Sequence, residues 1–416
     1  MTITHKRRVV ITGLGIISPI GIGKDEFSKA LFEGKSGTGR ITYFDSSAYS
    51  SQIDAEVKNF NPELYLEKKK IKRMDKFAQF ALASAIMAVT DSGLEIEKEN
   101  RNLIGVIVGS GIGGLSTIEQ EHKVLLERGP RKISPFLIPM LINNIASGEI
   151  AIKFGITGVN YSVTSACATS NHAIGDALRL IRYGDADIIL AGGTEAAITP
   201  LGFGGFCSIK ALSTNNEHPE RASKPFDKNR DGFVMAEGAG VLILEELAHA
   251  KARGAKIYTE LCGYGATDDA YHITAPNPDT KAVEAAMNRA ITDGGLVPQD
   301  IDYINAHGTS TLYNDKIETA AIKKVFGERA YQIPISSTKS MTGHCLGAAG
   351  GVELIATILS MENGYIHPTI NYETKDPECD LDYVPNKARK KQITAALSNS
   401  LGFGGHNAVL TIKKYD

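Results

Sequence analysis

This chain of 416 residues has few cysteines, and no two of them stand close together. The five are Cys167, Cys207, Cys262, Cys345 and Cys379. No pair has the C-x-x-C spacing, which disfavours both a zinc site and a disulfide framework. We therefore expect a protein of the reducing cytoplasm.

The sequence also lacks a long apolar run and an excess of charge of either sign. No stretch approaches the roughly 20 apolar residues needed to cross a bilayer, so we expect no membrane-spanning helix. The 45 Lys and Arg residues nearly balance the 47 Asp and Glu residues. The resulting net charge of −2 gives no global attraction to nucleic acid or to anionic lipid. With 43% hydrophobic residues, the chain can still bury a large core.

Short runs rich in valine and isoleucine alternate with helical patterns along the chain. The candidate strands, buried on both faces, are residues 8–17, 103–109, 187–191 and 240–244. Residues 77–92 and 171–183 carry apolar side chains at helical spacing. This alternation predicts an α/β fold.

The chain also repeats itself loosely at long range. In each half a run of small residues opens a helix, and a glycine-rich turn leads into the last strand. These segments are residues 164–167 and 232–240 in the first half, and residues 340–344 and 402–407 in the second half. Two similar α/β halves that meet near residue 256 would place both helix starts against a common centre.

Cys167 is the first candidate for chemistry, because it stands at the start of the predicted helix 171–183. Ser162, Thr164 and Ser165 supply possible N-caps just before it. The helix dipole and the unpaired N–H groups at such a position stabilise a thiolate, so we expect a lowered pKa for Cys167. The alternative is a small buried cysteine that only fills space.

Two histidines stand in similarly unusual settings. His307 ends a predicted strand and is followed by the turn Gly308-Thr309, and the ends of strands are where α/β folds build sites. His344 follows Gly343 beside a glycine-rich helix start. Either histidine alone could be an ordinary core or surface residue, but together with Cys167 they suggest one site.

These segments resemble the elongating β-ketoacyl-acyl carrier protein synthases, which are condensing enzymes of the thiolase fold. The motifs that carry the resemblance are Thr-x-Ala-Cys at 164–167, His-Gly-Thr-Ser-Thr at 307–311 with Asn-Asp at 314–315, Lys-Ser-x-x-Gly-His at 339–344, Gly-Ala-Ala-Gly at 347–350 and Gly-Phe-Gly-Gly at 402–405. Together they span most of the chain in order, whereas a single motif would be weak. The resemblance implies two pseudo-duplicated α/β halves in a layered αβαβα arrangement, residues 1–256 with the cysteine and residues 257–416 with the two histidines.

The resemblance also implies the reaction. The Cys167 thiolate would take an acyl group from its carrier protein, with the oxyanion held by the backbone N–H groups of Cys167 and Phe403. Malonyl carrier would lose CO2, His307 and His344 would donate hydrogen bonds to the enolate, and the enolate carbon would attack the Cys167 thioester. This is the chain-elongation step of fatty acid synthesis. A polyketide-type ketosynthase and a noncatalytic chain-length-factor-like subunit remain the alternatives.

Further roles follow only from the resemblance. Lys339 is expected to orient and polarise the second histidine, His344, with Glu353 as a structural carboxylate behind it. Phe403 is expected to act as a gate, in a loop that its flanking glycines leave free to move. The expected substrate-binding residues are Ile112 and Phe206 in the acyl tunnel, Thr309 and Thr311 at the pantetheine arm, and Gly402 and Gly404 in the gate loop.

The basic run at residues 68–73 is the strongest cluster of charge. It could be a solvated helix face, but an acyl carrier protein is acidic, and a basic patch would attract it. The expected carrier-docking residues are Lys69, Lys72 and Arg73, joined through the resemblance by Arg131, Lys132 and Lys210. The resemblance also implies a homodimer whose interface pairs strands from the two first halves.

The sequence disfavours several other interpretations. Residues 227–232 match half of an EF-hand loop, but Glu237 falls one place too early, so we expect no metal site. The run Gly13-x-Gly15 does not complete a G-x-G-x-x-G motif, and we expect no cofactor, leaving open a bound monovalent cation. A thiolase would carry Asn-Glu-Ala-Phe, which this sequence lacks, and an initiating synthase would have asparagine where this chain has His344. The chain departs from the family pattern at Leu137, Cys345 and His406.

Overall fold

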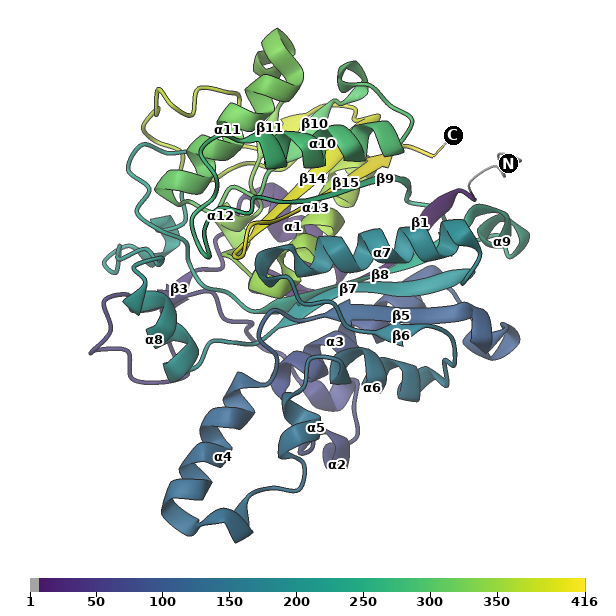
Figure 1. The fold of residues 1–416 in the computed structure, drawn as a ribbon, viewed down its shortest axis with the longest axis vertical. Coiled ribbons are helices and arrows are strands. Elements are labelled where there is room, and N and C mark those ends of the chain that lie inside the picture. The colour runs from purple at the N-terminus through teal and green to yellow at the C-terminus, as the bar shows by residue number, and fades with distance from the viewer. Residues whose placement is uncertain (1–6, 416) are drawn as a thin grey trace.

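One mixed sheet runs through the molecule in the computed structural model, which describes residues 7–415 (Figure 1). Residues 1–6 of the predicted first half and Asp416 of the second lie outside the described residues. The strand order is β11-β10-β14-β15-β9-β1-β8-β7-β5-β6, with β2 beside β1. The strands, in that order, are Ile335–Ser336, Tyr303–Asn305, Ala395–Gly402, His406–Lys413, Thr259–Asp268, Val9–Ser18, Gly238–Glu246, Ile188–Glu195, Ile104–Gly109 and Asn160–Tyr161, with β2 at Gly21–Ile22. Two small ribbons pair β3 (Gly39–Arg40) with β4 (Ile53–Asp54) and β12 (Tyr365–Ile366) with β13 (Arg389–Lys390).

The sheet has an internal symmetry about the contact between β9 and β1. On one side, β9 pairs with β15 and β15 with β14 in antiparallel fashion, while β14, β10 and β11 run parallel. On the other side, β1, β8 and β7 are antiparallel neighbours, while β7, β5 and β6 run parallel. The two sets meet where Val10 pairs with Glu260 and Ile11 with Thr259. The same sequence of pairings therefore occurs once on each side.

Helices fill the space between and outside the two parts of the sheet. The thirteen helices, α1 to α13 in order, are Lys24–Glu33, Lys68–Ile71, Lys76–Ser92, Leu115–Arg128, Leu137–Leu141, Ile145–Phe154, Thr169–Tyr183, Pro200–Ser208, Leu247–Ala252, Lys281–Asp293, Leu312–Phe326, Lys339–Thr342 and Ala349–Asn363, counted within residues 7–415. Helices α7 and α13 lie together in the middle, where α13 packs on both β8 and β14. Helix α3 covers β1 and β8 on one outer face, and α10 covers β9 and β15 on the other (Figure 1). This is the predicted layered αβαβα arrangement.

Glycines let the outer helices approach the sheet at equivalent places in the two parts. A Cβ atom on Gly15 of β1 would lie 1.8 Å from the Ser84 carbonyl oxygen of α3. A Cβ atom on Gly265 of β9 would lie 2.0 Å from the Ala286 carbonyl oxygen of α10. Both positions therefore require glycine, because the helix backbone packs directly against the strand.

The structure confirms the elements that were predicted from the sequence. The four candidate strands are β1, β5, β7 and β8, whose residues are buried along nearly their whole length. The two candidate helices are α3 and α7. The division of the chain at residue 256 stays a prediction. Within residues 7–415, no helix is long and apolar enough to cross a membrane.

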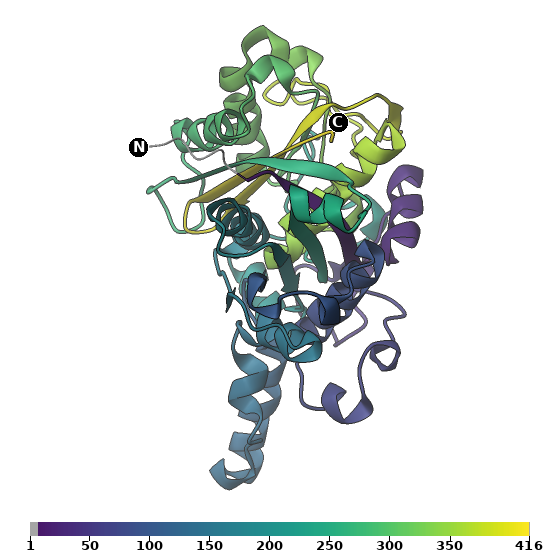
Figure 2. The same cartoon turned by 90° about the vertical axis from the view of Figure 1, so that its right-hand side faces the viewer.

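Helices α4 and α5 form an arm that projects from one end of the body (Figures 1 and 2). Helix α2 lies next to the base of this arm in Figure 1. The guanidinium of Arg73, just after α2, lies 4.5 Å from the ring centroid of Phe136, just before α5. This cation–π contact joins the basic segment at α2 to the start of α5 in the arm.

Candidate active site

Cys167 lies in a short helical turn, η5 (Ala166–Ala168), immediately before α7. The turn begins with Ala166, whose φ of 49° is the left-handed conformation that costs a non-glycine residue energy. Cys167 is 8% exposed, and its sulfur faces a cavity beside the central helices. The predicted position of Cys167 at a helix start is therefore confirmed.

The predicted direction of the Cys167 pKa is wrong. Burial of the thiol raises its pKa to about 12, because the charged thiolate would lose its hydration. The charge of Lys339 and a hydrogen bond from the Phe403 backbone N–H favour the thiolate, but they do not outweigh burial. Cys167 therefore rests as a thiol, and its proton must leave as it reacts.

His344 contacts the sulfur directly. Its Nε2 lies 3.0 Å from Cys167 Sγ, and its Nδ1 accepts a hydrogen bond of 3.3 Å from the Leu346 backbone N–H. Because Nδ1 is an acceptor, the ring proton resides on Nε2 and points at the sulfur. Burial, and secondly the charge of Lys339, hold the pKa of His344 well below its usual value, so the ring is neutral.

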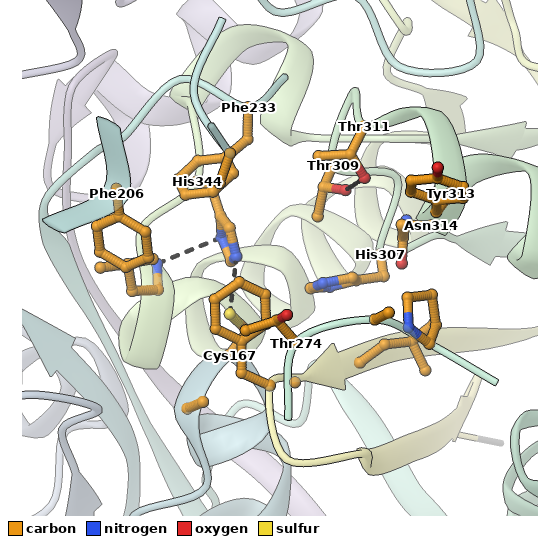
Figure 3. A pocket seen from close by; sticks show the side chains of 18 of the residues that line it. Cys167, Phe206, Phe233, Thr274, His307, Thr309, Thr311, Tyr313, Asn314 and His344 are labelled. Carbon is orange, nitrogen blue, oxygen red and sulfur yellow. Dashed lines mark hydrogen bonds between the residues drawn. The ribbon is translucent and has the colours of Figure 1, made fainter. Parts of the chain in front are cut away.

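His307 presents its ring to the same space. The ring centroids of His307 and His344 are 5.4 Å apart and nearly perpendicular. Figure 3 shows both imidazoles and the Cys167 sulfur directed into one cavity. Burial, and then the charges of Lys339 and His344, hold the pKa of His307 well below its usual value. The side chains predicted to form one site are therefore together.

Lys339 contacts His307 and not His344, so the predicted partner of this lysine is wrong. Its ammonium donates hydrogen bonds to the His307 carbonyl oxygen at 2.7 Å and to His307 Nδ1 at 3.2 Å. It also forms a buried ion pair with Glu353, as expected for a supporting carboxylate. Since an ammonium only donates, His307 Nδ1 must accept and Nε2 must carry the ring proton. Both histidines thus offer an Nε2–H group to the cavity.

Two buried carboxylates of the site were missed from the sequence. Glu318 on α11 accepts hydrogen bonds of 2.8 Å from the backbone N–H groups of His307 and Gly308, and a third from Asn399. Burial raises the pKa of Glu318 to about 7. Glu195, the last residue of β7, accepts four hydrogen bonds from the loop after β5 and from Gly347. The sequence contained a signal for Glu318, because this residue falls on the apolar face of α11 together with Ile322. It contained none for Glu195, whose hydrogen-bond partners are distant in sequence.

The cavity has a volume of about 490 Å³ and contains most of the predicted substrate-binding residues. Its wall includes Ile112, Phe206, Thr309, Thr311, Gly402 and Phe403, together with the sulfur and both imidazoles. The hydroxyls of Thr309 and Thr311 lie 2.9 Å apart on the side away from Phe206 (Figure 3). Gly404 is not part of this wall. Its N–H donates a hydrogen bond of 2.8 Å to the Ile273 carbonyl oxygen, in a loop outside the cavity. The prediction that Gly404 contacts substrate therefore gains no support.

The predicted carrier-docking residues are all exposed, but they lie in separate places. Lys69 belongs to α2, and Lys72 and Arg73 follow it. Arg131 and Lys132 form a short turn at the tip of the arm that follows α4. Lys210 lines the cavity itself, after α8. The chain therefore offers basic groups at the cavity, at α2 and at the tip of the arm.

The three departures from the family pattern leave the chemistry intact. Leu137 begins α5 on the arm, outside the cavity wall. Cys345 is buried, with its sulfur 3.5 Å from the Glu237 carbonyl oxygen. The imidazole of His406 lies 3.4 Å from the Asp268 carboxylate. The half EF-hand is a turn whose Asp227 carboxylate accepts backbone N–H groups of residues 229, 373 and 374, and no metal-binding cluster occurs within residues 7–415.

Comparison with known proteins finds relatives that match nearly the whole chain. The model of the beta-ketoacyl synthase N-terminal domain matches residues 6–250, and the model of its C-terminal domain matches residues 258–373. A 3-oxoacyl-[acyl-carrier-protein] synthase 2 of Coxiella burnetii is 52% identical, and one of Synechocystis is 53% identical, each over 99% of both chains.

Solved structures that resemble this chain include ketosynthases. A ketosynthase of a type II polyketide system, determined in complex with its acyl-carrier protein, has a TM-score of 0.92 at 38% identity over 99% of this chain and 100% of that one. A beta-ketoacyl synthase from Burkholderia phymatum has a TM-score of 0.91 at 33% identity, with the same coverage of both chains. The predicted fold class and family are therefore confirmed, and this chain belongs to the beta-ketoacyl synthase family.

Proposed function

We propose that this enzyme condenses malonyl-acyl carrier protein with an acyl group on Cys167 to give β-ketoacyl-acyl carrier protein, the elongation step of fatty acid synthesis. The observation that carries the proposal is the thiol of Cys167 beside two neutral imidazoles in one cavity. The relatives that are 52% and 53% identical bear the name of this activity and support it.

The first half-reaction loads the enzyme. The Cys167 sulfur attacks the thioester carbonyl of the acyl carrier, the bond from that carbon to the pantetheine sulfur breaks, and the thiol proton passes to the departing sulfur. The carbonyl oxygen, negative in the transition state, accepts hydrogen bonds from the backbone N–H groups of Cys167 and Phe403. The Phe403 N–H already points at the Cys167 sulfur, which supports this assignment.

The second half-reaction forms the carbon–carbon bond. The malonyl carboxylate leaves as CO2, and the electron pair of the broken bond forms an enolate whose oxygen accepts the Nε2–H groups of His307 and His344. The enolate carbon attacks the Cys167 thioester, its carbon–sulfur bond breaks, and the sulfur takes up one proton. Loss of CO2 makes the step effectively irreversible, so the chemistry calls for no cofactor and no strong base.

Lys339 and Glu353 are positioning residues in this proposal. The ammonium fixes the backbone and the ring tautomer of His307, and Glu353 balances its charge in the core. Phe403 serves as the gate between the cavity and the outside, and the left-handed φ values of Gly404 (85°) and Gly405 (84°) give its loop a conformation suited to glycine.

The carrier is the acidic acyl carrier protein, which we propose to dock on the basic residues. Lys210 lies closest to the chemistry, since it lines the cavity. Lys69, Lys72, Arg73, Arg131 and Lys132 lie at α2 and on the arm. We further propose a cytoplasmic homodimer, in which the short outermost strand β6, with both residues exposed, pairs with its copy.

A polyketide role is the second candidate, because the ketosynthase solved with its polyketide carrier has nearly the same fold. The higher identity to the fatty acid synthases, 52% and 53% against 38%, favours fatty acid elongation. A noncatalytic subunit would have no use for an intact cysteine and two oriented histidines. Incubation of the purified enzyme with malonyl carrier and acyl carriers of graded length tests the proposal. Release of one CO2 per β-ketoacyl carrier is expected, and the absence of this product would contradict it.

A further inference from the structure

Glu195 is a buried carboxylate without a cationic partner in its hydrogen-bond set. It is fully buried at the end of β7. Its Oε1 accepts the Ser110 hydroxyl at 2.8 Å and the Ile112 N–H at 3.2 Å. Its Oε2 accepts the Gly111 N–H at 2.9 Å and the Gly347 N–H at 3.0 Å. One side chain thus joins the loop after β5 to the turn before α13.

Both of these segments line the cavity. Ile112 forms part of the wall that we assign to the acyl chain. Gly347 follows Leu346, whose own N–H bonds to His344 Nδ1 and so fixes the tautomer of that ring. The backbone N–H groups of two consecutive residues, Leu346 and Gly347, therefore donate hydrogen bonds to His344 and Glu195. A shift of Glu195 would move the acyl wall and the support of His344 together.

The internal symmetry of the fold shows which group corresponds to the Glu195 carboxylate at the equivalent turn. Cys167 and Gly347 are the middle residues of equivalent turns, η5 (Ala166–Ala168) and η9 (Leu346–Ala348), and each turn begins with a left-handed residue, Ala166 at 49° and Leu346 at 47°. In the first turn, the N–H of the middle residue is assigned to the substrate oxyanion. In the second turn, the equivalent N–H is occupied by Glu195. A carboxylate oxygen thus occupies the place that corresponds to the substrate oxygen.

The fit around the carboxylate is tight. A Cβ atom on Gly111 would lie 2.7 Å from Glu195 Oε2, and one on Gly347 would lie 2.8 Å from the same oxygen. The Gly347 carbonyl oxygen also accepts the Ser170 hydroxyl of α7 at 2.6 Å. The turn is therefore held on both its donor and its acceptor side.

We propose that Glu195 is a positioning residue that sets acyl-chain selectivity by holding the Ile112 wall and the turn behind His344 as one unit. The inference rests on the proposed function, because it assigns the cavity to the acyl chain. Glu195 itself forms part of the cavity wall, and we assign it a role through Ile112 and His344.

Glu195→Gln separates the two connections. An amide has one acceptor oxygen, which serves Gly111 and Gly347 best, because the opposite orientation would set its NH2 against both of these N–H groups. The NH2 then faces Ser110, whose hydroxyl can rotate to accept, and the Ile112 N–H, which loses its acceptor. We expect the acyl wall to loosen in Glu195→Gln while the support of His344 is kept. Glu195→Ala removes both connections.

The test measures acylation of Cys167 by butyryl and myristoyl carriers, using mass spectrometry, and CO2 release from malonyl carrier. For Glu195→Gln we expect the ratio of the two acylation rates to change by about tenfold, the equivalent of one unsatisfied buried donor, with CO2 release within about twofold of wild type. For Glu195→Ala both should change. Ser110→Ala, which removes one donor to the carboxylate, should shift the ratio in the same direction by less.

Thr194→Val is the matched control. Thr194 is the neighbouring buried residue of β7, and its hydroxyl bonds to the Phe77 carbonyl oxygen at 2.6 Å, away from the cavity. An acylation ratio that stays at the wild-type value in Glu195→Gln and Ser110→Ala, or that moves equally in Thr194→Val at equal Tm, would overturn the proposal. A wild-type enzyme that forms no β-ketoacyl product would contradict the proposed function instead, and the acylation ratio would still report on Glu195.

Discussion

The Nε2 atom of His344 lies 3.0 Å from the sulfur of Cys167, although 177 positions separate the two residues in the chain. Cys167 precedes α7 and His344 precedes α13, and these helices pack together between the two parts of the sheet. The duplicated architecture therefore builds the site, because it brings the starts of two equivalent helices to one point.

The role of His307 is tested by its removal. We expect His307→Ala to lose CO2 release from malonyl carrier by about 10²–10³-fold, because one of two enolate donors is gone. Acylation of Cys167 should continue, since His307 does not contact the sulfur. Exposed His218 provides a control variant, His218→Ala, with unchanged rates. A His307→Ala enzyme that cannot be acylated would contradict the assigned role.

The buried pair of Lys339 and Glu353 predicts a loss of stability when one partner is removed. Lys339→Ala leaves Glu353 uncompensated, and the free energy of unfolding in urea should fall by about 3–5 kcal/mol. Lys339→Met combined with Glu353→Gln should recover part of this loss, because no charge stays buried. Decarboxylation should remain impaired in the double variant, since His307 Nδ1 has lost its donor. Equal stability of the single and double variants would disprove the charge argument.

A pH dependence of stability follows from His367. This ring is fully buried among Tyr303, Ser336 and Thr338, and burial lowers its pKa to about 4. Below pH 6.5 the unfolded chain binds a proton that the folded protein excludes until about pH 4, so acid favours unfolding across that window. Relative to His367→Gln, wild type should lose about 2 kcal/mol of unfolding free energy between pH 7 and pH 5. Urea unfolding at both pH values measures this difference, and parallel behaviour of the two proteins would contradict the assignment.

Docking of the carrier should depend on charge. We expect Lys69→Glu with Arg73→Glu to raise KM for acyl carrier roughly tenfold at low salt, with kcat nearly unchanged, because two exposed charge pairs at up to about 1 kcal/mol each are lost. The effect should shrink as salt is added. Lys251→Glu on α9, far from the arm in Figure 1, is the control. A KM that is insensitive to the first two changes would remove these residues from the docking surface.

Local sequence patterns were enough to find the three side chains that the structure brings together in the cavity. Cys167, His307 and His344 each stand beside a strand end or a glycine-rich helix start, and the α/β alternation indicated where those ends would be. Features that depend on tertiary burial were not accessible in this way. The dipole at a helix start argued for a low Cys167 pKa, but the desolvation that raises it comes from residues far along the chain.

Partners that are distant in sequence explain the other differences. Lys339 is near His344 in the chain, yet the turn of α12 directs its ammonium to His307. Glu195 binds backbone N–H groups of residues far away in the chain, and such groups leave no residue signature in a sequence. For Glu318 the only signal was its place on the apolar face of α11. Gly404 belongs to a conspicuous motif, but its contacts lie outside the cavity.

Cys167→Gln is the sharpest test of the separate roles of the sulfur in acyl transfer and of the imidazoles in decarboxylation. We expect this variant to release CO2 from malonyl carrier, because His307 and His344 are intact, and to form no β-ketoacyl product. Measurement of CO2 and product in the same reaction gives the answer. Normal condensation by the variant would show that Cys167 is not the nucleophile, and loss of CO2 release in a folded variant would show that the imidazoles do not act without it.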